Sequence, residues 1–360
     1  MTDVSTAAIG TQRPSARAVL RQAFAGLPNV MLTLVAALVA LLALVPFVRW
    51  AIVDARWSGT ATECRAAGVG ACWAFIGHKL PFILFGLYPV AERWRPAFAT
   101  GLLIALVVAS MVPRLWRRAL LLVWLAGLAV VFWLMSGGGP FMRVSTQEWG
   151  GLPITILLTV VGLALGFPLG VLLALGRRSR HPYPRIAATA IVEVVRGVPL
   201  VAVLYLAVLV VPLMLRGGVE IDKLLLAQCG VAVFAAAYLA EAVRAGLQLV
   251  PSRRTDAARA LGLTWWQSTR LVVLPEALRI VLPSFVSIAV GFFQDTSLIV
   301  IIGLFDLLNT ARLAAQDPAW LGFHTEAYVF VGCLYFAVSA AVSRYGLWLE
   351  RRLAASTRRM

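Results

Sequence analysis

Long, uninterrupted apolar runs restrict the folds that are open to this chain. Eight segments have about the length that a helix needs to cross the hydrocarbon core of a bilayer. They cover 29–50, 97–113, 119–136, 151–175, 186–215, 224–249, 279–303 and 326–348. A soluble fold could not bury this much apolar surface, since 61% of the 360 residues are hydrophobic and only 13% are charged. The sequence predicts an all-α, polytopic membrane protein with about eight transmembrane helices.

Two apolar stretches depart from the simple pattern of a spanning helix. The segment 186–215 is long and contains Gly197 and Pro199, which predicts a tilted or broken helix. The stretch 73–90 is interrupted by two prolines, a histidine and a lysine. We expect this stretch to be an interfacial or re-entrant piece that lies outside the membrane.

The basic residues are distributed unevenly between the loops. A net charge of +16 in a soluble domain would suggest nucleic-acid binding, but here the basic residues lie mostly between apolar runs. If the N-terminus is inside, the inner segments hold 21 of the 32 basic residues and the outer segments hold 10. This bias predicts two cytoplasmic termini and contact with anionic membrane lipid, with no nucleic-acid partner.

A glycine-rich run at 136–140 divides the chain into two parts. The first apolar run is long and keeps its own basic flank, so we expect it to be a retained span. The predicted parts are a cytoplasmic tail (1–28), three accessory helices (29–140) with a large outer loop (51–96), a working core (141–350) and a second tail (351–360).

Motifs of the common enzyme classes are absent from the sequence. It contains neither the P-loop pattern G-x-x-x-x-G-K-[ST] nor the nucleophile elbow G-x-S-x-G. The three histidines, His78, His181 and His324, lie in separate loops without the spacing of metal ligands. We therefore expect no catalytic residues, no metal and no cofactor on this chain.

The loop between the sixth and seventh spans has the pattern of two short helices. Gly262 can take the left-handed conformation that ends a helix, and Thr264 can cap a second helix that Pro275 follows. An apolar face then lies on the cytosolic side and requires a partner. This face consists of Leu261, Leu263, Trp265 and Trp266.

Two other interpretations of this loop are open. The spacing is compatible with a helix-turn-helix DNA reader, although the short connectors to the membrane and the missing third helix argue against it. The loop could also be an amphipathic hairpin in the interface, with its tryptophans at the level of the headgroups.

The same loop resembles the EAA loop of binding-protein-dependent ABC importer permeases. The pattern of that loop is E-A-A, three residues, Gly, nine residues and I-x-L-P, with Asp256 here in place of Glu and Val272 in place of Ile. The resemblance implies a coupling segment (250–278) that docks in a groove of an ATPase subunit. The residues implied in coupling are Asp256, Ala257, Ala258, Leu261, Gly262, Leu263, Leu274 and Pro275.

Three further segments resemble permeases for polar amino acids, and the resemblance covers about 145–350. They are Glu193-Val-Val-Arg-Gly-Val-Pro-Leu200, Tyr238-Leu-Ala-Glu-Ala-Val-Arg-Ala-Gly246 and the stretch from Leu274 to Pro283. The extra spans are similar to those of the long, M-type permeases of general L-amino acid importers. Gln294 stands where that family usually has a lysine.

The resemblance implies a set of partners in the bacterial inner membrane. They are an ATP-hydrolysing subunit that carries ATP and Mg, a second permease that is a different but related chain, and a periplasmic amino-acid-binding protein. The rival class is a stand-alone channel or ion-coupled carrier, which would need no cytosolic docking loop.

Charged residues inside the apolar spans are candidates for a substrate path. An intramembrane charge costs about 2.5–3.5 kcal/mol on the insertion scale, which suggests that such a residue has a functional or structural role. A zwitterionic substrate requires both signs of charge on its route, while the alternative is structural ion pairing between helices. Arg196 is expected either to pair with Asp295 or to face the carboxylate of the substrate. The candidates are Glu193, Arg196, Pro199, Glu241, Gln294, Asp295 and Thr296.

Cys64 and Cys72 share the large outer loop. In an oxidising compartment they can form a disulfide that stabilises the loop by about 2–3 kcal/mol. The alternative is two reduced thiols at the membrane surface.

Overall fold

The computed structural model describes residues 23–66, 68–115, 119–215 and 221–357. Its contacts divide the chain into two compact units, one that ends at Ala74 and one that begins at Phe75. Nearly all of the elements are helices, which confirms the predicted all-α class. Within the described ranges, the sheet is a parallel pair of two-residue strands, β1 (Gly150–Gly151) and β2 (Phe305–Asp306).

The first unit consists of one long apolar helix and a small disulfide-closed segment. Helix α2 (Leu27–Val48) has no buried residue, and its apolar side chains cover every side, as expected of a helix surrounded by lipid. A π-helical turn, η1 (Arg49–Val53), follows it, and α3 (Ala61–Cys64) lies beyond. Cys64 and Cys72 are joined by a disulfide, with their Cα atoms 5.7 Å apart.

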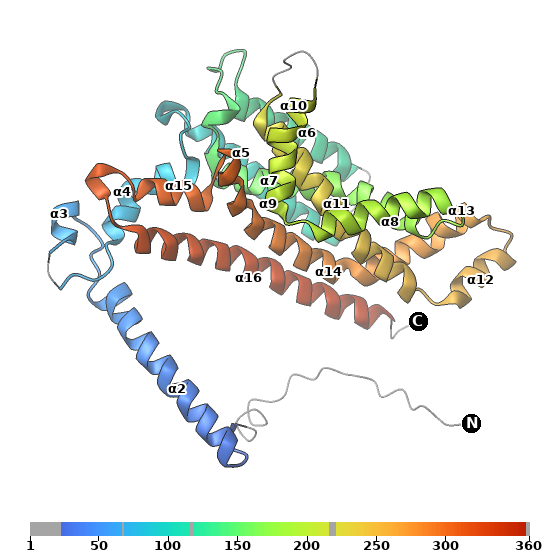
Figure 1. Cartoon of the computed structure of the whole chain (residues 1–360), viewed down its shortest axis with the longest axis horizontal. Helices are drawn as coiled ribbons and strands as arrows, with labels where there is room; N and C mark the ends of the chain where they lie inside the picture. Colours follow the sequence, from blue (N-terminus) through green and yellow to red (C-terminus); the bar gives the residue numbers. More distant parts are fainter. Residues whose placement is uncertain (1–22, 67, 116–118, 216–220, 358–360) are drawn as a thin grey trace. The chain divides into compact units, whose positions relative to one another are not determined.

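The second unit contains the remaining helices (Figure 1). They are α4 (Trp73–Phe85, which begins in the first unit), η2 (Val90–Glu92), α5 (Trp94–Met111), η3 (Pro113–Leu115), α6 (Ala119–Ser136), η4 (Thr146–Glu148), α7 (Leu152–Arg177), α8 (Pro182–Gly197), α9 (Leu200–Tyr205), η5 (Leu206–Val210), α10 (Val211–Met214), α11 (Lys223–Leu249), α12 (Ser252–Ala260), α13 (Trp265–Ser268), η6 (Thr269–Val273), α14 (Leu274–Asp295), η7 (Thr296–Ile302), α15 (Leu307–Ala314), η8 (Pro318–Trp320) and α16 (His324–Thr357).

The described residues include seven helical segments that are long and apolar enough to span a membrane, or eight if the bent pair α8 and α9–α10 is one span. The predicted spans are therefore present, but some of their bounds were wrong. The seventh covers Trp265–Ile302 rather than 279–303, because its helix continues from the coupling segment through the π turn η6. Helix α4 has 13 residues, too few for an ordinary spanning helix.

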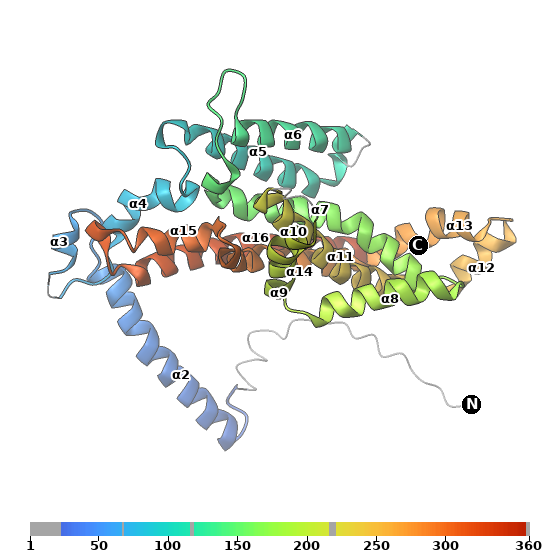
Figure 2. The ribbon, with the colours of Figure 1, turned by 45° about the horizontal axis from the view of Figure 1, so that its top comes forward.

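Helices α7 and α11 form the centre of the second unit, and α14 and α16 continue the layer beside them (Figures 1 and 2). Gly162, Gly166 and Gly170 recur every four residues on the face of α7 that contacts α11. A β-carbon at Gly166 would lie 2.9 Å from the carbonyl oxygen of Ala232. Small residues at this spacing allow two backbones to approach closely, which is how helices commonly associate where water cannot drive them together.

We call the two ends of the second unit the α15 end and the α12 end. Helix α4 lies beside α15 at the first, while α12 and α13 project from the opposite end (Figures 1 and 2). The Thr310 hydroxyl donates to the Ile83 carbonyl at 2.7 Å, and Lys79 pairs with Asp317, also at 2.7 Å. The stretch predicted as an interfacial piece therefore includes a short helix packed on α15.

A buried carboxylate organises the start of α15. Asp306 is completely buried, and its two oxygens accept hydrogen bonds from the backbone N–H groups of Leu308 and Asn309 and from the Tyr335 hydroxyl. Burial raises the pKa of Asp306 above its ordinary value, against the opposing effect of these hydrogen bonds. The carboxylate thereby connects the cap of α15 to α16.

Candidate functional site

A cavity of about 680 Å³ opens where α8 meets α9. Its walls come from the break between these two helices and from α11, α14 and η7. Most lining groups are apolar or aromatic, with one base and one acid among them. The lining residues are Arg196, Gly197, Val198, Pro199, Leu200, Phe234, Tyr238, Ser287, Ile288, Gly291, Phe292, Asp295 and Leu298.

The break that forms one wall of the cavity follows from local sequence. Pro199 has no N–H to continue a helix, and its ring moves the preceding residue away from helical angles. Val198 and Pro199 are both extended, and α8 meets α9–α10 at an angle of 108°. The predicted interruption of this span is confirmed. Glu193 and Arg196 therefore lie on an amphipathic helix rather than within a straight apolar span.

Arg196 and Asp295 both line the cavity. The Arg196 guanidinium lies 5.5 Å from the centroid of the Tyr238 ring. Asp295 is the last residue of α14, and among the described residues none forms an ion pair or hydrogen bond with its carboxylate. A direct pair between Arg196 and Asp295 is absent from this structure, because the carboxylate that Arg196 contacts is Glu241, at 3.6 Å.

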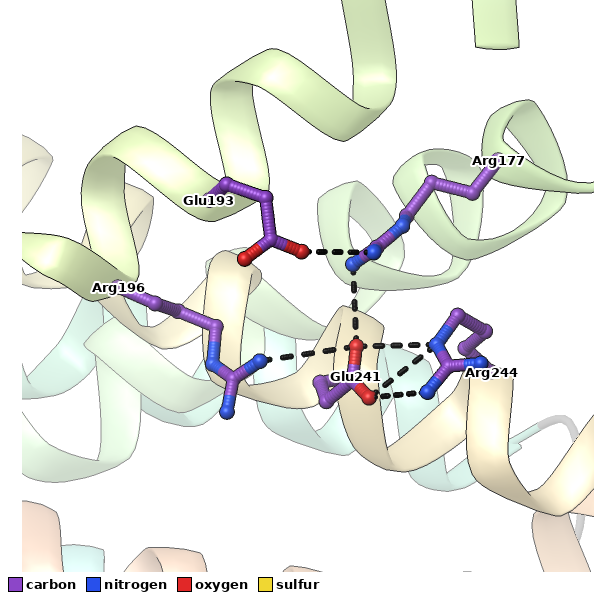
Figure 3. Close-up of polar contacts among 5 residues, drawn as sticks. All are labelled: Arg177, Glu193, Arg196, Glu241 and Arg244. Atoms are coloured by element: carbon purple, nitrogen blue, oxygen red, sulfur yellow. Dashed lines mark hydrogen bonds and ion pairs between the residues drawn. The ribbon is translucent and has the colours of Figure 1, made fainter. Parts of the chain in front are cut away.

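Five charged residues, one of which is Arg196, form what we call the Glu241 cluster. It consists of Arg177, Glu193, Arg196, Glu241 and Arg244 (Figure 3). The two terminal nitrogens of Arg177 bind Glu193 Oε1 at 2.7 Å and Glu241 Oε2 at 3.0 Å. Arg244 also binds Glu241 through its Nε and Nη2 atoms. Three arginines and two glutamates give the cluster a net charge of +1.

The structure separates the predicted path residues into three groups. Arg196, Pro199 and Asp295 line the cavity, whereas Glu193 and Glu241 join Arg196 within the Glu241 cluster. The two remaining residues, Gln294 and Thr296, are not part of the cavity lining. Gln294 donates to Ser339 on α16, and the Thr296 hydroxyl donates to the Phe293 carbonyl.

Sequence reasoning missed Arg177. It is the last residue of α7, where it counts as one of several basic residues at the inner end of a span. Its partners lie 16 and 64 residues away along the chain. A signal that could have identified it is the pair of acids, Glu193 and Glu241, on the two helices that pack against α7.

The segment between α11 and α14 has the predicted local geometry. Gly262 has a φ of +78°, and Thr264 caps α13 in a reciprocal capping box with Gln267. Leu261 is 81% exposed and both tryptophans of α13 are about half exposed, so the apolar face is uncovered in this chain. The second helix does not end before Pro275. It continues through η6 into α14, where Pro275 is tolerated in the first turn.

A family model described as "Binding-protein-dependent transport system inner membrane component" matches residues 166–355. The match covers more than half of the chain, and the chain belongs to this family of membrane-embedded transport subunits. The matched range includes the cavity, the whole Glu241 cluster and the α12–α13 segment.

Two relatives and one solved structure that resemble this chain are named for amino acid transport. The inner membrane amino-acid ABC transporter permease protein YhdY of Escherichia coli K12 is 43% identical, over 85% of this chain and 84% of that protein. The glutamate/glutamine/aspartate/asparagine transport system permease protein BztC of Rhodobacter capsulatus is 33% identical, over 92% of each chain. A solved structure, "Crystal structure of an amino acid ABC transporter with histidines", has a TM-score of 0.50 at 27% identity and covers 55% of this chain and 90% of that one. The resemblance to amino acid permeases is confirmed.

Proposed function

We propose that this chain is the membrane-spanning subunit of an ATP-binding-cassette importer for L-amino acids and forms half of the translocation path. The observation that carries the proposal is the cavity at the broken helix. It has Arg196 on one wall and, on another, Asp295, which has no ion-pair partner among the described residues. Transport relatives named for amino acids support the substrate class.

The chemistry of the cavity suits the main-chain groups of an amino acid. A carboxylate in apolar surroundings is tolerable only beside water, a cation or hydrogen-bond donors. The ammonium group of an amino acid would supply the cation for Asp295, and Arg196 would face the carboxylate. Phe234, Tyr238 and Phe292 leave apolar space for the side chain.

The α12–α13 segment supports coupling to a partner ATPase, which would hold ATP and Mg while this chain performs no covalent chemistry. Leu261 and the two tryptophans present an exposed apolar face at the α12 end. Such a face is typical of a docking site. The proposed coupling residues remain Asp256, Ala257, Ala258, Leu261, Gly262, Leu263, Leu274 and Pro275.

The remaining parts of the proposal concern assembly and orientation. The α12 end would face the cytoplasm with both termini, and the α15 end would face the periplasm of an inner membrane. A related second permease and a periplasmic binding protein would complete the importer. The permease core would occupy 141–350, with accessory helices before it.

The test of the substrate path is Asp295→Asn, which removes a charge and almost no volume. The importer with its ATPase should accumulate normally and keep ATP hydrolysis stimulated by the binding protein, while amino acid uptake into vesicles should fall at least tenfold. Asp317→Asn, an acid that lies outside the cavity, is the matched control. Normal uptake by Asp295→Asn would remove this residue from the path, and failure to accumulate would assign it a structural role.

Purification separates the importer from a stand-alone carrier. The affinity-tagged chain should bring down an ATPase subunit from membranes in mild detergent, because the exposed α12–α13 face requires a partner. Uptake by the chain alone in vesicles, without ATP, would contradict the importer proposal.

A further inference from the structure

Helix α8 has little apolar packing to fix its position. Of its 16 residues, only Ala188 and Val192 are buried. Tyr183, Ile186 and Val194 are each more than 60% exposed. The break at Val198 and Pro199 also removes the continuous hydrogen-bond ladder that would make α8 continue the direction of α9. The position of Arg196, on the last turn of α8, must therefore depend on other contacts.

The polar contacts of Arg177 supply such a connection. Its guanidinium joins Glu193 on α8 to Glu241 on α11, with distances of 2.7 and 3.0 Å (Figure 3). The side chain is only 13% exposed, while Glu193 is 57% and Glu241 25% exposed. A planar guanidinium presents two donors in a fixed geometry, so it can hold two carboxylates on different helices at once. Arg177 thus fastens the C-terminal half of α8.

The same contacts set how strongly Glu241 attracts Arg196. Three guanidinium groups surround one carboxylate, and Arg196 is the most distant of them, at 3.6 Å. Arg177 and Arg244 already bind both oxygens of Glu241. Without Arg177, Glu241 would lose one of its bound cations and would draw Arg196 closer, away from the cavity.

We propose that Arg177 is a positioning residue of the translocation path, which keeps Arg196 available to the cavity by occupying Glu241. The inference rests on the proposed function, since it assigns Arg196 to the path. It differs from a purely structural ion-pair network because the effect of Arg177 on the cavity must pass through Glu241.

A thiol reporter tests this link without any substrate. Ser287→Cys places a cysteine in the cavity lining, in a background where the free cysteines Cys229 and Cys333 are changed to alanine. The measurement is the ratio of modification rates with an anionic sulfonatoethyl and a cationic trimethylammonioethyl methanethiosulfonate. An available Arg196 raises this ratio, because it attracts the anion and repels the cation.

The informative change is Arg177→Lys, which preserves the charge but removes the two-pronged guanidinium. The ratio should fall about threefold or more if positioning matters, and should stay unchanged if only the net charge matters. In a Glu241→Gln background the same change should have no further effect. Arg178→Lys is the matched control, because Arg178 donates to the backbone carbonyl of Leu247 rather than to a carboxylate.

Two results would overturn the proposal. One is a ratio for Arg177→Lys equal to that of the parent protein, and the other is an equal fall with and without Glu241. If Arg177→Lys does not accumulate in the membrane, the test uses the double variant Arg177→Lys with Glu241→Gln. This double variant must accumulate, and its ratio of modification rates must equal that of Glu241→Gln alone. If the double variant also fails to accumulate, the role of the Glu241 cluster is to stabilise the fold, which contradicts the proposal. Because the reaction needs no transport, its outcome is independent of the Asp295→Asn uptake test.

Discussion

The two ends of the second unit are held together by different kinds of contact. At the α15 end, a buried hydrogen bond joins α15 to α4, and glycines leave no room between backbones. At the α12 end, α8 buries two side chains and is fastened by the ion pairs of Arg177, while the α12–α13 face is uncovered.

The difference indicates which end can move. Close backbone packing is bistable or rigid, because a shift of even a few tenths of an ångström creates a clash or a gap. A partly exposed ion pair is worth little in water and can exchange partners at small cost. The α15 end therefore has the character of a fixed support, and the α12 end that of a movable element.

The largest effect is expected from Gly151→Val, which attacks the fixed end. Gly151 has a φ of +69°, and a β-carbon there would lie 2.1 Å from the Leu84 carbonyl oxygen. Backbone strain and overpacking together should cost at least about 3 kcal/mol, and membrane accumulation should fall at least tenfold. Gly77→Ala in the neighbouring α4 meets no atom within 4 Å and should accumulate normally. Equal accumulation of the two variants would contradict the rigid-support interpretation.

A second prediction concerns function at the movable end. Leu261→Glu charges an exposed side chain, so stability should change by no more than about 0.5 kcal/mol. Transport-coupled ATP hydrolysis should nevertheless fall about tenfold, because the charge would enter the proposed interface. Gln316→Glu, which adds a charge at an exposed position of the α15 end, should leave coupling unchanged. If Leu261→Glu keeps transport-coupled ATP hydrolysis at the wild-type level, the α12–α13 face is not part of the interface with the ATPase.

The third prediction is a dependence on pH at the fixed end. Asp306→Asn replaces one acceptor with a donor and should destabilise the protein by about 1–3 kcal/mol. Because burial raises the pKa of Asp306, its contribution is fully present below about pH 4 and is lost as pH rises through the folded-state pKa. The deficit of the variant should thus be larger near pH 5 than near pH 8 in thermal unfolding. A deficit that grows with pH would show that the hydrogen bonds outweigh desolvation.

The smallest effect should come from Asp317→Asn, which breaks the partly exposed pair with Lys79. The hydrogen bond from Lys79 lowers the pKa of Asp317, so the contribution of this pair is present above about pH 4 and is lost as pH falls further. Thermal unfolding should shift by no more than about 2 °C at neutral pH. A shift as large as that of Asp306→Asn would mean that the pair, rather than the buried cap, secures this end.

The sequence predicted those local features, such as helix breaks and caps, that depend only on residues close together along the chain. Pro199 broke its helix because of its own ring, and Gly262 and Thr264 ended and began helices through their own backbone preferences. Gln294 shows the limit of this reasoning. One residue along a helix is a rotation of about 100°, so its neighbour Asp295 lines the cavity while Gln294 contacts α16.

The sequence by itself determined the membrane class, the approximate spans and the family, because apolar run length and short motifs are properties of contiguous residues. Tertiary structure alone decided which charges on different helices meet. Arg196 could have paired with Glu193, Glu241 or Asp295 by composition, and the packing of α7 against α8 and α11 assigned it to Glu241 and placed Arg177 between the two acids. The physical reason is that the attraction between two charges depends on their distance in space and not on their separation along the sequence. The folded structure therefore selects the partner.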